Sequence, residues 1–171
     1  MRTHIKISGI MIAFLAISSM LQAQKCKYNY DKVDEITGKA VKGISVELDS
    51  DWEITLHKED KSYCLELRFE KAAGQLTEDL EKGSPLVLKL ANGELINLVS
   101  KEKVTPKAEL AGFVVVVVYR IKYDISPEDI QKMSEQMLTF GRVEIQNTTF
   151  DISVKVKEAT KFKQAAVCIL Q

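Results

Sequence analysis

The chain has 171 residues, of which 46% are hydrophobic and 28% are charged, with 24 basic and 24 acidic side chains. This length suits one domain, and the even charge balance excludes the basic surface that nucleic-acid binding requires. The three cysteines and two histidines are too few for a zinc site that uses several histidines.

The first 23 residues differ in composition from the rest of the chain. Arg2 and Lys6 precede an apolar run over residues 10–21, and the small Ala23 stands before Gln24. This order predicts a secretory signal peptide over residues 1–23. The alternative is a retained anchor, although the run is shorter than the roughly 20 residues of a bilayer span.

We therefore expect one domain over residues 24–171, periplasmic or secreted, with no stable membrane span after cleavage. Its 22 basic and 24 acidic residues give a formal charge of −2. Export permits a disulfide, and an odd number of cysteines leaves at least one thiol. Sequence does not fix the pairing. We favour Cys26 with Cys168, because that bridge would hold the two ends of the domain together.

Hydrophobic residues alternate along the first half of the domain, as in half-buried strands. Residues 27–48 predict a hairpin that turns at Thr37-Gly38-Lys39. Residues 51–57 and 62–69 predict two strands joined by a charged loop over residues 58–61. Residues 86–99 predict another hairpin, in which Asn92-Gly93 is typical of a type I′ turn.

Five consecutive valines occupy residues 114–118, between Phe113 and Tyr119. The run is far too short to span a bilayer, and a short β-branched run predicts a strand that is buried on both faces. We expect the strand, about residues 112–123, to be central in its sheet, with one or both helices over the second face.

Two helices are expected in the last third of the chain. Ser126 with Pro127 has the pattern of a helix start, and Ile130, Met133 and Met137 follow helical spacing as core residues. Residues 157–168 predict the second helix, with an apolar stripe formed by Ala159, Phe162, Ala166 and Ile169. Residues 141–156 predict a hairpin between them that turns at Asn147-Thr148, a sequence that also fits a glycosylation acceptor.

The fold class expected is therefore α+β, an antiparallel β-sheet with two packed helices. A shift of 55 residues superimposes residues 62–69 on residues 117–124 and the turn at Asn92 on that at Asn147. Both halves then have the same order of elements, which is consistent with a duplication or with a chance repeat of a common α+β unit.

The start and end of the mature chain resemble a group of small uncharacterised exported proteins of Bacteroidetes-type bacteria. The shared pattern is a Cys-x-Tyr start, an acidic VDE segment, a TGK turn and a cysteine near the C-terminus. The matching residues are Cys26, Tyr28, Val33, Asp34, Glu35, Thr37, Gly38, Lys39 and Cys168. The resemblance implies export and a shared fold, and it implies no catalytic residues.

The sequence lacks a Gly-x-Ser-x-Gly elbow, a Cys-x-x-Cys pair and a Gly-rich phosphate loop. The segment containing Asp49, Asp51 and Glu53 lacks the glycine and the glutamate of a calcium loop. His57 and Cys64 are expected to be diagonal neighbours on adjacent strands, roughly 7–8 Å apart, which is the basis of a thiol-enzyme alternative.

We expect no cofactor and no metal site. The function expected is a non-catalytic binding or interaction module with a protein or small-molecule partner. The alternative is a thiol-dependent hydrolase or other thiol enzyme that uses Cys64 with His57. The position of Cys64 bears on this choice, because a buried or disulfide-bonded thiol would exclude the enzyme.

Overall fold

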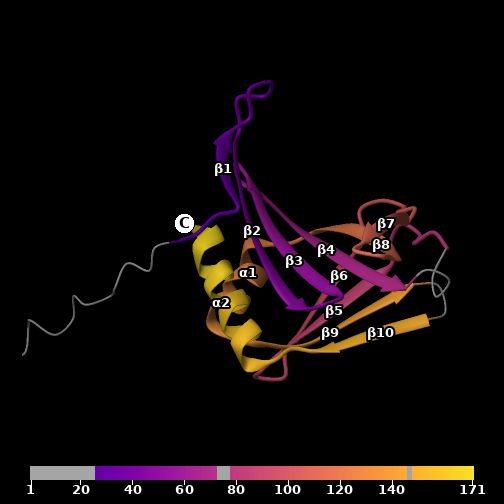
Figure 1. Cartoon of the computed structure of the whole chain (residues 1–171). Coiled ribbons are helices and arrows are strands. Elements are labelled where there is room, and N and C mark those ends of the chain that lie inside the picture. The colour runs from indigo at the N-terminus through magenta and orange to yellow at the C-terminus, as the bar shows by residue number, and fades with distance from the viewer. Residues whose placement is uncertain (1–25, 73–77, 146–147) are drawn as a thin grey trace, which may run out of the picture.

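A computed structural model of the chain describes residues 26–72, 78–145 and 148–171. This part contains ten strands and two helices, arranged as two curled sheets with the helices packed at one end (Figure 1). Their bounds in chain order are β1 (Tyr30–Val33), β2 (Ala40–Asp49), β3 (Trp52–Glu59), β4 (Ser62–Ala72), β5 (Pro85–Leu90), β6 (Leu95–Val99), β7 (Lys107–Ala111), β8 (Val114–Asp124), α1 (Pro127–Glu135), β9 (Leu138–Ile145), β10 (Thr148–Ser153) and α2 (Val156–Leu170).

The larger sheet has six strands in the order β1-β2-β3-β4-β8-β7, and every neighbouring pair is antiparallel. The smaller sheet has four strands in the order β10-β9-β5-β6. An isolated bridge between Ser100 and Tyr123 joins the end of β6 to β8, so the two sheets approach each other there. The expected α+β fold is confirmed, with two sheets where one was expected.

The core lies between the inner faces of the two sheets and the helices. Leu65, Leu67 and Ile121 from the larger sheet and Leu86 and Leu88 from the smaller sheet are almost fully buried. The alternation of apolar and polar residues explains this arrangement, because each strand turns one set of side chains to the core and the other set outward. The core therefore uses one face of each sheet.

The two helices close one end of this core. Ser126 caps α1, since its Oγ accepts a hydrogen bond from the backbone N–H of Asp129 at 3.0 Å. The expected stripe of α2 is buried throughout and packs against β2, β3 and β9. Met137 is an exception to the sequence prediction, because it follows the end of α1 and is partly exposed.

The strand with the five valines is interior to its sheet, between β4 and β7, but it is next to the edge strand and is not central. Its burial changes along its length: Val114 is 59% exposed and Val115 is 46% exposed, whereas Val117 and Val118 are buried. The prediction of burial on both faces is therefore wrong for the first half of the run.

The helices do not provide the expected second layer over this strand. α2 packs on β2, β3 and β9, away from β8, and α1 packs on α2. Val118, on the outer face, stands between Glu70 of β4 and Lys107 of β7. Long charged side chains bury their aliphatic stems against such a position, so its burial needs no helix.

The turns differ in detail from those expected. The loop between β3 and β4 contains only Asp60 and Lys61, because Glu59 is paired with Ser62. In the β5–β6 hairpin the Gly93 N–H donates to the Leu90 carbonyl, and Gly93 alone has positive φ. This is a type I turn followed by a glycine bulge, not the expected type I′ turn. The β9–β10 hairpin is confirmed, although Asn147 lies outside the described residues.

The shift of 55 residues corresponds to a symmetry in strand order. Shifted in this way, β3, β4, β5 and β6 overlap β7, β8, β9 and β10, respectively. The strands then form two units, β3-β4-β8-β7 within the larger sheet and β10-β9-β5-β6 as the smaller sheet. The central pair of each unit, β4–β8 or β5–β9, consists of two strands that the shift superimposes, and both pairs are antiparallel. In the described residues, α1 connects β8 to β9, whereas no helix lies between β4 and β5. A duplication remains a prediction.

The predicted signal peptide, residues 1–23, lies outside the described residues. Within the described ranges, neither helix is long and apolar enough to cross a membrane.

Candidate functional site

A disulfide joins the two ends of the domain. Cys26 and Cys168 are bonded, with their Cα atoms 5.5 Å apart, as expected. The Tyr28 hydroxyl donates to the Cys168 carbonyl at 2.9 Å and so satisfies a backbone group at the end of α2. The disulfide indicates a non-reducing compartment. Cys64 is the remaining thiol of the described chain.

The residues of the TGK pattern form the turn between β1 and β2. Asp34 Oδ1 accepts hydrogen bonds from the backbone N–H groups of Ile36 and Thr37, at 3.1 and 2.7 Å. Gly38 has φ 68° and supplies the left-handed conformation that ends the turn. The hairpin projects from the body of the protein (Figure 1). In this chain the residues of the pattern therefore hold a turn and a terminal clamp.

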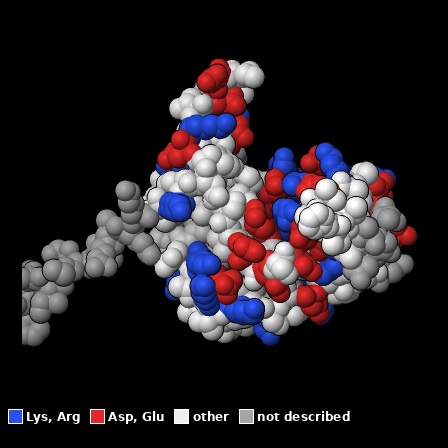
Figure 2. All heavy atoms as spheres, viewed as in Figure 1, with Lys and Arg blue, Asp and Glu red and all other residues white. Residues whose placement is uncertain are grey.

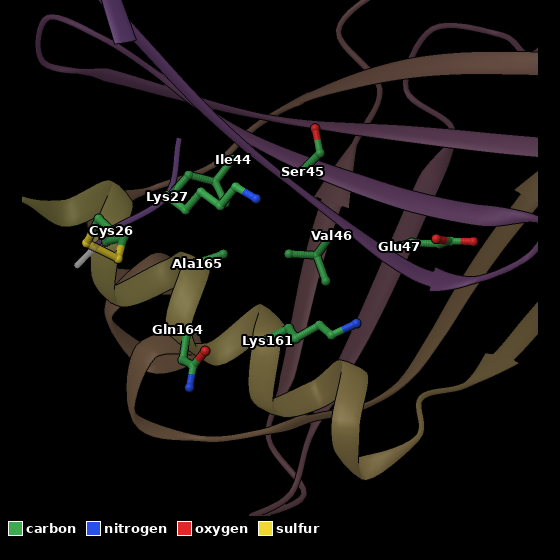
Figure 3. A pocket seen from close by; sticks show the side chains of 10 residues that line it. Cys26, Lys27, Ile44, Ser45, Val46, Glu47, Lys161, Gln164 and Ala165 are labelled. Carbon is green, nitrogen blue, oxygen red and sulfur yellow. A yellow bond between two sulfur atoms is a disulfide. The ribbon is translucent and has the colours of Figure 1, made fainter. Parts of the chain in front are cut away.

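A groove separates β2 from α2 beside the disulfide. Its first pocket has a volume of about 360 Å³. Ile44, Val46 and Ala165 form an apolar floor, and Lys27 and Lys161 extend along the opening (Figure 3). The remaining lining residues are Cys26, Ser45, Glu47, Gln164 and Cys168. Apolar surface with a few convergent polar groups is typical of a binding site.

One wall of the groove is a strand edge without a neighbouring strand. β1 pairs with β2 only as far as Gly43, so on the side away from β3 no strand of the described chain lies beside Ile44–Asp49. The Gly43 carbonyl and the Ser45 N–H face away from β3, because both bond to Asn29. Alternation along a strand turns the backbone groups of Glu47 to the same side. Asn29 already binds the Gly43 carbonyl and the Ser45 N–H, so the groups that face the open edge for a further strand are the Ser45 carbonyl and the N–H and carbonyl of Glu47.

The groove continues along β2 into a second pocket of about 290 Å³, which shares Glu47 and Lys161 with the first. Lys155 and Lys157 line this continuation on the helix side, and Asp49 lines it on the strand side. In Figure 2 lysine and arginine atoms accordingly gather over α2, whereas carboxylates gather over the strands beside it. The helix wall therefore has Lys155, Lys157 and Lys161 with one carboxylate, Glu158, and the strand wall has Glu47 and Asp49.

His57 and Cys64 lie directly opposite each other on β3 and β4, not diagonally as predicted. The expected four-residue loop would place His57 opposite Ser62. The turn has only two residues, Asp60 and Lys61, so the partner of His57 moves by two residues to Cys64. Both side chains line a pocket of about 300 Å³ together with Glu66, Lys122 and Asp124. The structure thus brings the two predicted residues closer than the sequence indicated.

Tyr30 orients the ring of His57. The Tyr30 ring lies over Gly43, where an added Cβ would meet it at 2.2 Å, and the Tyr30 hydroxyl hydrogen-bonds His57 Nδ1. If the hydroxyl donates this bond, the imidazole proton is on Nε2, which faces Glu66 Oε2 at 3.8 Å. Nε2 has no hydrogen-bond partner among the described residues.

Burial sets the protonation of this pair. It lowers the pKa of His57, against the attraction of Glu66, and raises the pKa of the Cys64 thiol. Both groups are therefore neutral near pH 7. A nucleophilic cysteine requires the thiolate, which a neighbouring cation or base must stabilise. Cys64 is half-buried and not disulfide-bonded, so it meets neither condition that would exclude the enzyme.

The acidic residues at the start of β3 contact charged residues of the neighbouring strands. Asp51 binds Lys71 at 2.6 Å, and this contact lowers the pKa of the Asp51 carboxyl. Glu53 lies opposite Glu47 and Arg68 in the strand register. No group of three or more candidate ligands within the described ranges is arranged to hold a metal ion.

Comparison with known proteins finds no matching family, curated protein or solved structure. The groove residues Lys27, Glu47 and Lys161 were not singled out from the sequence. They come from three separate segments, and only the packing of α2 beside β2 brings them together. The one available sequence signal was the cysteine pair, which placed the two ends of the domain beside each other.

Proposed function

We propose that this protein is an exported binding module that receives an extended peptide along the open edge of β2. The observation that supports this proposal is the strand edge at Ile44–Asp49, which faces the groove beside α2. An extended peptide can join such an edge through main-chain hydrogen bonds, while pockets beside the edge select its side chains.

The groove favours a peptide with apolar and acidic side chains. Ile44, Val46 and Ala165 offer an apolar floor for side chains that point inward. Lys27, Lys155, Lys157 and Lys161 line the groove as cations, and of these Lys161 has a carboxylate neighbour, Glu158, at 3.9 Å. We therefore expect carboxylates on the side of the peptide that faces α2.

Export to the periplasm or the exterior is part of the same proposal. Its support is the disulfide together with the composition of residues 1–23. Membership of the Bacteroidetes-type group of exported proteins rests on the residues of the β1–β2 turn and the terminal clamp. Intact-mass measurement on the protein from its native host tests export, since a mass that includes Met1 would contradict it.

A proline substitution at the groove tests the binding mode. Random nonapeptides displayed on phage are first selected on the immobilised parent protein. The affinity of the selected peptides is then measured for the parent protein and for the variants Glu47→Pro and Glu47→Ala. Glu47→Pro removes the N–H that faces the groove, and an open edge tolerates proline. We expect Glu47→Pro to abolish binding and Glu47→Ala to retain it. Equal binding by both variants would contradict strand addition.

A thiol enzyme is the second candidate, because His57 and Cys64 face each other in a pocket. The rate of Cys64 alkylation by iodoacetamide at neutral pH distinguishes it. A rate above that of free cysteine would indicate a stabilised thiolate and support the enzyme. We expect a slower rate, since burial raises the pKa of the thiol.

A further inference from the structure

The hairpin of β7 and β8 ends in an exposed apolar tip. Leu110 is 74% exposed and Val114 is 59% exposed, while Phe113 at the turn is fully exposed and Val115 is nearly half exposed. The turn has two residues, Gly112 and Phe113, and it places the aromatic ring at the extreme end of the hairpin. Soluble domains seldom expose several adjacent large apolar side chains without a partner.

This tip is apolar on both faces of the hairpin. Val115 is paired with Leu110 and lies on the same face of β8 as the buried Val117 and Tyr119, which face the core. Val114 is paired with Ala111 on the opposite, outer face. A flat protein surface would cover only one of these faces. A lipid layer surrounds an inserted tip on all sides and would cover both.

The dimensions of the tip suit shallow insertion. A strand rises about 3.4 Å per residue, so the segment from Leu110 to the turn is about 7 Å long. This length matches the roughly 5–10 Å to which interfacial elements enter the boundary between headgroups and acyl chains. The backbone of the edge strand β7 would then remain within reach of interfacial water.

Charged side chains begin immediately behind the tip. Lys107 is exposed at the base of β7, about 14 Å from Ala111 at the strand rise given above. Arg120 and Glu109 form an ion pair at 2.6 Å on the outer face. In Figure 2 an uncharged patch accordingly lies over the β7–β8 end, with charged residues around it. Lys107 would lie at the level of the lipid headgroups.

We propose that the β7–β8 tip is a membrane-docking element that inserts into the interface of a phospholipid bilayer. The proposal concerns peripheral attachment and does not involve the groove beside β2. The apolar residues Leu110, Phe113, Val114 and Val115 enter the layer, and Lys107 favours anionic headgroups. A second copy of the chain is the competing occupant, and it gives a different result in the experiment.

Vesicle flotation tests the tip directly. The protein is mixed with vesicles of phosphatidylglycerol and phosphatidylethanolamine, and the floated fraction is measured for the parent protein, the double variant Phe113→Ser/Val114→Ser and the control Leu95→Ser. Leu95 is 51% exposed on the other sheet, at the start of β6. We expect the double change Phe113→Ser/Val114→Ser to reduce the partition coefficient by about tenfold or more, and Leu95→Ser to leave it unchanged.

A tryptophan at the tip provides a second measurement. Trp52 is 4% exposed, so its emission is insensitive to the surroundings of the protein. In Phe113→Trp, vesicles should shift the added emission to shorter wavelength, and brominated lipids should quench it. Failure of the parent protein to float, or equal flotation of the tip and control variants, would overturn the proposal. So would a lipid-free dimer, measured by sedimentation equilibrium, that the tip substitutions dissociate.

Discussion

The two ends of the six-stranded sheet differ in how they meet their surroundings. At one end, α2 packs against β2, the disulfide fixes the chain ends, and a groove with charged walls remains. At the other end, the β7–β8 tip exposes apolar residues on both faces. β2 alternates apolar and polar residues, whereas β8 begins with five consecutive valines, of which Val114 is exposed and Val118 is buried. Exposure is therefore decided by what packs on a strand and not by the composition of the strand.

The largest expected effect separates the two halves of the valine run. Val117→Asp places a carboxylate in the core, which costs several kcal/mol of a total stability of about 5–15 kcal/mol. Val117 is 6% exposed, whereas Val114 is 59% exposed. We expect Val117→Asp to unfold the protein and Val114→Asp to be nearly silent in a thermal melt. Unfolding by both variants would show that the tip is buried.

Loss of the disulfide should be the next largest effect, and it acts at the opposite end. The bridge closes a loop of 142 residues. The chain-entropy model gives an upper value of about 5 kcal/mol for such a loop, and measured values are typically about 2–4 kcal/mol. Urea unfolding of Cys26→Ser/Cys168→Ser measures the loss. Cys64→Ser is the control, and an equal loss there would contradict this assignment.

Two glycines, one at each end, should respond to alanine for different reasons. In Gly43→Ala the new Cβ meets the Tyr30 ring, so we expect the ring to move away from His57 at a cost of about 1–2 kcal/mol. In Gly112→Ala no described atom lies within 4 Å of the new Cβ. Its positive φ of 63° alone costs about 1 kcal/mol.

The imidazole signals of His57 in NMR spectra distinguish the two glycine variants. We expect Gly43→Ala to shift these signals and Gly112→Ala to leave them unchanged. A shift in both variants would show that the two ends are coupled.

The smallest expected effect is a pH dependence at the groove end. Burial lowers the pKa of His57 in the folded protein below the value of an exposed histidine, about 6.5, so the unfolded chain binds the proton more readily. Stability should therefore be greatest above the unfolded pKa and should fall as the pH decreases towards the folded pKa. Unfolding at about pH 7.5 and about pH 5 measures this, and His57→Gln should reduce the difference. An unchanged difference would exclude His57 as its source.

The local structure was predictable where the residues of one short segment are enough to determine it. Ser126 with Pro127 predicted the start of α1, and the stripe of α2 predicted its buried face. Asn92-Gly93 predicted a hairpin but not its turn type, since both type I′ and bulged type I turns favour these residues. The disulfide was also predicted, because the two ends of a compact domain can lie close together.

By itself, the sequence determined the alternation of the strands, the starts of the two helices and the terminal clamp, since these depend on neighbouring residues or on the chain ends. Only the tertiary structure decided that β8 lies beside the edge strand and that β2 keeps an open edge beside α2, whereas the facing of His57 and Cys64 follows from the two-residue turn between β3 and β4. Five valines predict a strand wherever they lie, but they do not specify its neighbours. Strand order comes from contacts between distant segments, which leave no local pattern in the chain, whereas register within a hairpin follows its turn.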